Sequence, residues 1–164
     1  MQLFAPAKIN LRFRILRRRD DGFHEIETLM APISLGDELT IEADDRLSFT
    51  CDDASLPSGD DNLVLRAVRS FFTEIKAEPR VRIALRKKVP HGAGLGGGSS
   101  DAASTLLGLN ELLGDPLPRA RLTNLAAALG SDVPFFLSQS AALCRGRGEI
   151  VEPVATLLVP LMVS

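Results

Sequence analysis

A glycine-rich segment from Pro90 to Ser104, PHGAGLGGGSSDAAS, has the residue types of a phosphate-binding loop. It holds five glycines within residues 92–98, and a start of small residues typical of a helix follows. Glycine lets backbone N–H groups approach a phosphate without side-chain obstruction. The first turn of a helix adds unpaired N–H donors and partial positive charge. We therefore predict an anion site here, with added hydroxyl donors from Ser99 and Ser100.

The common glycine-rich nucleotide motifs match this segment poorly. A Walker loop requires a lysine after its glycines, and none follows here. A GxGxxG pattern is met at Gly92, Gly94 and Gly97, but the surrounding βαβ repeat of a dinucleotide-binding fold is missing. A flexible linker is the alternative to a phosphate-binding loop. It is disfavoured because the segment runs from a predicted strand into a predicted amphipathic helix.

A phosphoryl transferase also needs a group that accepts the hydroxyl proton and positive charge near the transferred phosphoryl. Asp132, in LGSDVPFF, and Lys8, in APAKINLRF, are the candidates. Each also has an ordinary structural interpretation, Asp132 as a helix cap and Lys8 as the solvated end of a strand. Sequence spacing alone does not decide between these interpretations.

Alternating apolar and polar residues predict strands from Leu11 onward and over 38–43, 46–51 and 81–90. The segment 24–35 is expected to be extended but broken at Pro32, with a turn at Gly36-Asp37. A final strand is expected over 157–164.

Helical spacing of apolar residues predicts helices over 62–77, 100–114 and 116–130, followed by a short helix and a hairpin within 131–154. Asp61 or Asn62 is expected to cap the first helix, and Ser99 or Ser100 the second. Strands followed by helices, without regular βαβ alternation, predict an α+β fold.

Composition narrows the function classes. The chain has 164 residues, 45% hydrophobic content and a formal net charge of −2, which favours one folded domain without a broad nucleic-acid or anionic-membrane surface. No apolar run approaches the roughly 18 residues of a membrane span, and no signal peptide is visible, so we expect a cytoplasmic protein. The basic run at residues 17–19 is predicted to be a solvated turn because two aspartates follow it.

The cysteines and histidines predict no metal site. Cys51 and Cys144 lie far apart without CxxC spacing and are expected to be buried thiols. His24 and His91 share no zinc-ligand spacing with them.

Four segments in order resemble one family. PAKINL, RRRDDGFHEIETLM, PHGAGLGGGSSDAA and LGSDVPFF are similar to segments of the 4-diphosphocytidyl-2-C-methyl-D-erythritol kinases of the GHMP kinase superfamily. The glycine run is common to the superfamily, whereas DGFHE together with AKIN and GSDVPFF is typical of these kinases. The resemblance covers about residues 4–148.

The resemblance implies an ATP- and Mg²⁺-dependent kinase that phosphorylates the 2-hydroxyl of a small cytidine-diphosphate-linked methylerythritol in the non-mevalonate isoprenoid pathway. It implies an N-terminal domain like domain 2 of ribosomal protein S5 over residues 1–152, with residues 153–164 beginning a C-terminal domain that is otherwise absent. We therefore expect little activity from the chain alone, and self-association through the face that the missing domain leaves.

Carried over by position, the resemblance implies that Asp132 accepts the hydroxyl proton and that Lys8 pairs with it. Asn10, Phe23 and His24 match substrate contacts, with Phe23 stacking on the cytosine and His24 recognising its edge. A core aromatic is the alternative for Phe23, although its place in a turn disfavours it. The residues that match the ATP loop are Pro90, Gly92, Gly94, Leu95, Gly96, Gly97, Gly98, Ser99 and Ser100, and those near the adenine are Asn62 and Lys87.

Three other functions stay open. Another GHMP kinase, for homoserine, mevalonate or a sugar, would keep the glycine loop but has no need of DGFHE. A truncated domain that only binds nucleotide would keep the loop without turnover. An S5-like RNA-binding domain would share the fold alone, and the sequence pI of about 5.7 argues against it.

Overall fold

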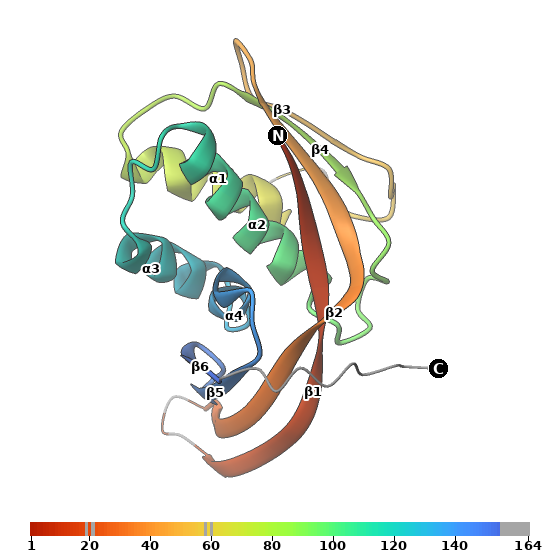
Figure 1. Cartoon of the computed structure of the whole chain (residues 1–164), viewed down its shortest axis with the longest axis vertical. Coiled ribbons are helices and arrows are strands. Elements are labelled where there is room, and N and C mark those ends of the chain that lie inside the picture. The colour runs from red at the N-terminus through yellow and green to blue at the C-terminus, as the bar shows by residue number, and fades with distance from the viewer. Residues whose placement is uncertain (19, 21, 58, 60, 155–164) are drawn as a thin grey trace.

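The computed structural model describes residues 1–154 except 19, 21, 58 and 60. Its described residues form one mixed sheet with the helices packed on one face, which confirms the α+β prediction (Figure 1). The strands are β1 (Gln2–Arg18), β2 (His24–Ala43), β3 (Ser48–Cys51), β4 (Val81–Arg86), β5 (Ala142–Gly146) and β6 (Ile150–Pro153). The helices are α1 (Leu63–Glu74), α2 (Gly97–Leu112), α3 (Arg119–Leu129) and α4 (Val133–Ser138).

Strand β2 organises the sheet. One of its edges pairs antiparallel with β1 along most of its length. Its other edge pairs with β5 through residues 26–30 and with β4 through residues 38–43. Strand β3 then pairs in parallel with β4, and β6 pairs antiparallel with β5. Strand β2 therefore joins the β3–β4 part of the sheet at one of its ends to the β5–β6 part at the other.

The expected break at Pro32 and the turn at Gly36-Asp37 are wrong, because β2 runs through both. The irregularity appears instead as a shift in the β1–β2 register between Pro6 and Lys8. Proline is tolerated in a sheet at such a bulge. Gly36 serves close packing, since a Cβ at this position would lie 2.5 Å from the Phe4 ring.

The expected serine cap of α2 is also wrong. Helix α2 begins at Gly97 after an N-cap at Gly96, whose φ of 72° lies in the left-handed region that favours glycine. The amide of Ser100 donates to the carbonyl of Gly96 at 2.9 Å, so Ser99 and Ser100 lie inside the first turn. By contrast, Asn62 caps α1 as expected, because its side-chain oxygen accepts from the amide of Val64 at 2.9 Å.

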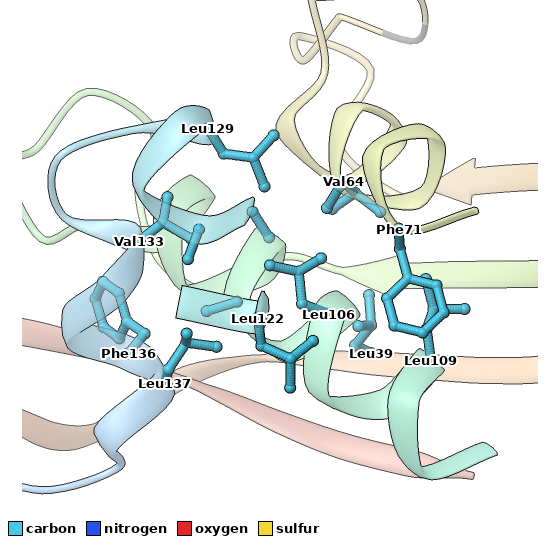
Figure 2. Close-up of a cluster of buried hydrophobic side chains, with 14 of the residues drawn as sticks. Leu39, Val64, Phe71, Leu106, Leu109, Leu122, Leu129, Val133, Phe136 and Leu137 are labelled. Atoms are coloured by element: carbon cyan, nitrogen blue, oxygen red, sulfur yellow. The ribbon is translucent and has the colours of Figure 1, made fainter. Parts of the chain in front are cut away.

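The hydrophobic core lies between the helices and the sheet (Figure 2). Helix α2 is at its centre, with Leu106 and Leu109 fully buried beside Phe71 of α1 and Leu39 of β2. Gly108 lets α2 approach the sheet closely, because a Cβ there would overlap side-chain atoms from β1 and β2. This packing fixes where the N-terminus of α2 lies.

Two sequence expectations concern the far end of the chain and the membrane. The strand expected over 157–164 lies outside the described residues, and the domain boundary after residue 152 stays a prediction. In the part of the chain that the structure describes, no helix has the length and apolar character needed to cross a membrane.

Truncating the central aromatic residue should destabilise the domain. We expect Phe71→Ala to lower the free energy of unfolding by about 3–5 kcal/mol, because it removes a fully buried ring and leaves a cavity. Chemical denaturation measures this loss. Phe13→Ala is the matched control: its ring is 52% exposed on β1, and we expect a change below about 0.5 kcal/mol. Equal losses for the two variants would contradict this description of the core.

Candidate phosphate-binding and catalytic site

The glycine run forms one wall of a cavity of about 380 Å³. Gly92, Gly94 and Gly96 all have φ near +73°, which bends the loop back toward the start of α2. The first-turn N–H groups of α2 lack partners within the helix, and a 16-residue helix concentrates positive potential at this end. The predicted loop residues that line the cavity are Pro90, Gly92, Gly94, Leu95, Gly96, Gly97, Gly98 and Ser99; Asn62, Lys87 and Asp132 line it as well.

Lys8 joins the glycine loop to the candidate base. Its backbone amide donates to the carbonyl of Leu95 at 2.9 Å, which anchors the loop to β1. Its Nζ lies 3.7 Å from Oδ2 of Asp132 and donates to Oδ1 of Asn10 at 2.7 Å. Lys8 is only 8% exposed, so the interpretation as a solvated strand end fails. Three predicted site residues therefore meet at the rim of the cavity.

Asp132 occupies the N-cap position of α4 but makes no side-chain capping hydrogen bond. Its carboxylate faces Lys8 instead, with the side chain 34% exposed. Gly148, in the turn between β5 and β6, lies close enough that a Cβ there would be 3.5 Å from Oδ1 of Asp132. Asp132 is thus held by its place at the start of a buried helix and stays accessible to a ligand.

Cys144, which the sequence predicts to be a buried thiol, is near the Lys8–Asp132 pair. Cys144 on β5 is fully buried, and burial, followed by the charge of Asp132, raises the pKa of its thiol to about 12. Cys51 is half-buried, and burial also raises its pKa. Both are free cysteines, and neither is ionised at neutral pH.

Lys87 lies in a buried ion cluster. Its Nζ donates to Oδ2 of Asp37 at 2.5 Å and to Oδ2 of Asp101 at 2.8 Å. All three side chains are almost fully buried, at 7%, 0% and 3% exposure. A Cβ on Gly97 would lie 3.3 Å from this Nζ, so the cluster sits directly beneath the start of α2. The ammonium group of Lys87 is therefore engaged by two carboxylates at the floor of the cavity.

Asn62 also has its polar groups engaged. Its Oδ1 caps α1, and its Nδ2 donates to the carbonyl of Pro57 at 2.8 Å. Asn62 and Lys87 both line the cavity, so each is in a position to contact a nucleotide base there. The adenine contacts expected of Asn62 and Lys87 stay predictions.

A second cavity, of about 350 Å³, is lined in part by Ser131, which precedes Asp132 in the chain. Phe23 is 54% exposed, so the interpretation as a core aromatic fails. The guanidinium of Arg147 lies 5.0 Å from the centre of the Phe23 ring, a cation–π geometry. The lining residues are Phe23, His24, Ala127, Ala128, Gly130, Ser131 and Arg147.

Sequence reasoning missed Asp37, Asp101 and Arg147. Asp37 was assigned to a turn because it follows Gly36, yet it lies within β2. Asp101 is an acidic residue among the small residues that begin α2, and that contrast is the available signal in the sequence. Arg147 stands between two glycines in the β5–β6 turn, where only the fold brings it to Phe23.

Residues 62–140 match the family model described as GHMP kinases N terminal domain. The chain is 49% identical over 159 residues to a 4-diphosphocytidyl-2-C-methyl-D-erythritol kinase of Methylacidiphilum infernorum (isolate V4), covering 96% of this chain and 55% of that relative. It is 50% identical over 166 residues to an enzyme of the same name from Synechococcus sp. (strain CC9605), covering 97% and 53%. The chain spans about half the length of these curated relatives.

Solved structures agree with this likeness. A crystal structure of 4-(cytidine 5'-diphospho)-2C-methyl-D-erythritol kinase matches with a TM-score of 0.82 and 44% identity, covering 94% of this chain and 55% of that one. A mevalonate kinase of Methanococcus jannaschii matches with a TM-score of 0.68 at 15% identity, covering 95% and 56%, and shows the shared fold alone.

Removing the cation from the buried cluster should be costly. We expect Lys87→Met to lower the free energy of unfolding by about 3–5 kcal/mol, because two buried carboxylates lose their shared partner. Chemical denaturation at neutral pH measures this. Lys88→Met is the control: Lys88 pairs with Glu38 in an exposed position, and the midpoint should stay unchanged. A Lys87→Met midpoint equal to that of the parent would refute the role assigned to the cluster.

Proposed function

We propose that this chain, which has the fold of a GHMP kinase N-terminal domain and corresponds to the N-terminal portion of the 4-diphosphocytidyl-2-C-methyl-D-erythritol kinases, supplies the phosphate loop and catalytic pair of such a kinase. The reaction is ATP-dependent phosphorylation of the 2-hydroxyl of 4-diphosphocytidyl-2-C-methyl-D-erythritol, a step in the non-mevalonate route to isoprenoids. The observation that carries the proposal is the Lys8–Asp132 pair at the rim of the glycine-loop cavity.

The loop and helix α2 bind the polyphosphate of ATP in this proposal. Backbone N–H groups from the loop and from the first turn of α2 supply donors, and the helix end supplies positive potential. Gly96 must stay a glycine, because a Cβ would lie 2.9 Å from the ring of Phe136 and the backbone has positive φ. The loop thereby presents backbone rather than side chains to the phosphates.

Asp132 orients the acceptor hydroxyl and takes its proton on Oδ2 or Oδ1 as the oxygen attacks the γ-phosphorus. Lys8 holds this carboxylate in place and offsets negative charge that builds up on the transferred group. Asn10 fixes the lysine by accepting a hydrogen bond from Nζ. Positioning and electrostatics supply most of the rate, since phosphoryl transfer requires little covalent help from the protein.

Magnesium is compatible with the residues present. Among the described residues no group of three or more Asp, Glu, His or Cys side chains forms a protein-only cation site. That is the expected pattern when nucleotide phosphates provide most of the oxygen ligands. Bound Mg²⁺ would neutralise charge on the phosphates.

The acceptor would occupy the second cavity. The exposed Phe23 ring offers a face for a pyrimidine, and His24 beside it offers a donor or acceptor for the base edge. Ser131 lines this cavity and its neighbour Asp132 lines the other, so adjacent residues of the chain face the two cavities. A nucleotide in one and an acceptor in the other would bring phosphate and hydroxyl to the same carboxylate.

Replacing the base tests the proposed chemistry. We expect Asp132→Asn to lower turnover by about 10²–10⁴-fold while nucleotide affinity stays nearly unchanged, because the amide keeps the shape but accepts no proton. The assay uses ATP, Mg²⁺ and 4-diphosphocytidyl-2-C-methyl-D-erythritol, with this chain alone and with the chain joined to the C-terminal half of the Methylacidiphilum relative.

Asp61→Asn is the control for the assay, since Asp61 lines the same cavity whereas the ion pair with Lys8 is made by Asp132. Its turnover should match that of the parent. An Asp132→Asn variant as active as the parent would remove Asp132 from the mechanism. Nucleotide binding without turnover in either form of the parent would favour the non-catalytic alternative.

Replacing His24 tests which class of acceptor the second cavity binds. We expect His24→Ala to weaken binding of 4-diphosphocytidyl-2-C-methyl-D-erythritol by about tenfold or more, through loss of a hydrogen bond to the base. Calorimetric titration measures this, with His91→Ala as control because His91 lines the nucleotide cavity instead. Unchanged affinity in His24→Ala would favour a kinase for homoserine, mevalonate or a sugar.

A further inference from the structure

The ion cluster beneath the phosphate loop has an unequal charge count. One cation, Lys87, meets two carboxylates, Asp37 and Asp101, and water reaches none of the three side chains appreciably. An uncompensated charge in such a place is expensive, so a buried group in excess tends to bind a proton and become neutral. The geometry around each carboxylate indicates which one holds that proton.

Asp37 receives most of the hydrogen bonds in the cluster. Its Oδ1 accepts from the backbone amides of Lys88 at 2.6 Å and Val89 at 2.8 Å, and its Oδ2 accepts from Lys87. Three donors therefore point at this one group. Hydrogen bonds to the charged form of a carboxylate stabilise that form.

Asp101 has the opposite environment. Its Oδ2 accepts from Lys87, its carboxyl group lies within hydrogen-bond reach of Asp37, and its Oδ1 is buried without a donor among the described residues. The charged groups that act on it are Lys87, from the segment after β4, and Asp37, from β2. An acid with one buried, unpartnered oxygen is the member of the cluster suited to carrying a proton.

The cluster also lies where a polyphosphate would feel its charge. Asp101 is in the second turn of α2 and lines the glycine-loop cavity. An ionised Asp101 would cancel part of the positive potential that the helix end offers to phosphate. Protonation removes that repulsion and leaves the contact of Oδ2 with Lys87 in place.

We propose that Asp101 is a positioning residue that takes up a proton when a nucleotide polyphosphate enters the glycine-loop cavity, so that nucleotide binding is linked to pH. The inference rests on the proposed function, since it assumes that the cavity accepts a nucleotide. The proton comes from the solvent and ends on a carboxylate oxygen of Asp101. No bond to phosphorus is involved.

The direction of the pH effect follows from the environment of Asp101. Burial, together with the charge of Asp37, raises the pKa of Asp101 to about 7 in spite of Lys87. Negative charge from bound phosphates raises this pKa further. Binding is therefore insensitive to this group well below pH 7, where Asp101 is protonated in both states. Affinity falls as the pH rises from about 7 to the higher pKa of the bound state.

Calorimetric titration of the chain with the magnesium complex of a non-hydrolysable ATP analogue tests this linkage. Titrations at pH 7.5 in buffers of different ionisation enthalpy measure the protons taken up. We expect uptake of about half a proton, and affinity that falls about fivefold or more between pH 6.5 and 8.5. Asp101→Asn should abolish both effects, which separates them from the titration of the nucleotide itself. Glu111→Gln, at the exposed far end of the same helix, should keep both.

A carboxyl ¹³C NMR titration of the free chain measures Asp101 without any ligand. Titration near pH 7 supports the inference, and titration below about pH 5 overturns it, whatever the calorimetry gives. Nucleotide binding with equal proton uptake in the parent and Asp101→Asn overturns the inference but leaves the proposed function standing. Absence of nucleotide binding in the parent overturns both.

Discussion

The buried contact of Lys87 with Asp37 and Asp101 joins three parts of the chain that lie beneath the glycine loop. Asp37 belongs to β2, Lys87 follows β4, and Asp101 lies in α2, so one ammonium group ties the sheet to the helix whose end faces the cavity. Apolar packing brings α2 onto the sheet but has little direction of its own. Charged hydrogen bonds are directional, so they fix the distance of the helix end from the sheet and its orientation.

The bulge between β1 and β2 has a matching role on the catalytic side. The register shifts between Pro6 and Lys8, just where Lys8 turns its amide to Leu95 and its ammonium to Asp132. On an edge strand, alternate amides point away from the partner strand and are available for such a contact. Pro32 and Gly36, which resemble chain breaks in the sequence, pair with Lys8 and Pro6 on either side of this shift.

Local sequence patterns predicted the helices and strands whose apolar residues recur at regular spacing. They failed where contacts between distant parts of the chain determine the structure. The helix cap at Asn62 and the alternating strand at 81–86 depend on neighbours in sequence, and both were predictable. The start of α2 was misplaced because serine is the better cap in isolation, whereas the loop requires the left-handed backbone of Gly96. The pairing of Asp37 with Lys87 joins residues 50 apart in sequence, and no periodicity reports such a contact.

The contacts that orient the catalytic pair all lie within the described residues, so its geometry is a property of this domain. Water still reaches Asp132, whose side chain is 34% exposed, and a hydrated carboxylate holds a hydroxyl less firmly than a dry one. Exclusion of water must therefore come from what binds against this surface. Asp132 lines one cavity and its neighbour Ser131 lines the other, so ligands in both would cover much of this surface. Under the proposed function, proton acceptance by Asp132 would become efficient only when both cavities are filled, which would keep water from reacting at the phosphoryl group.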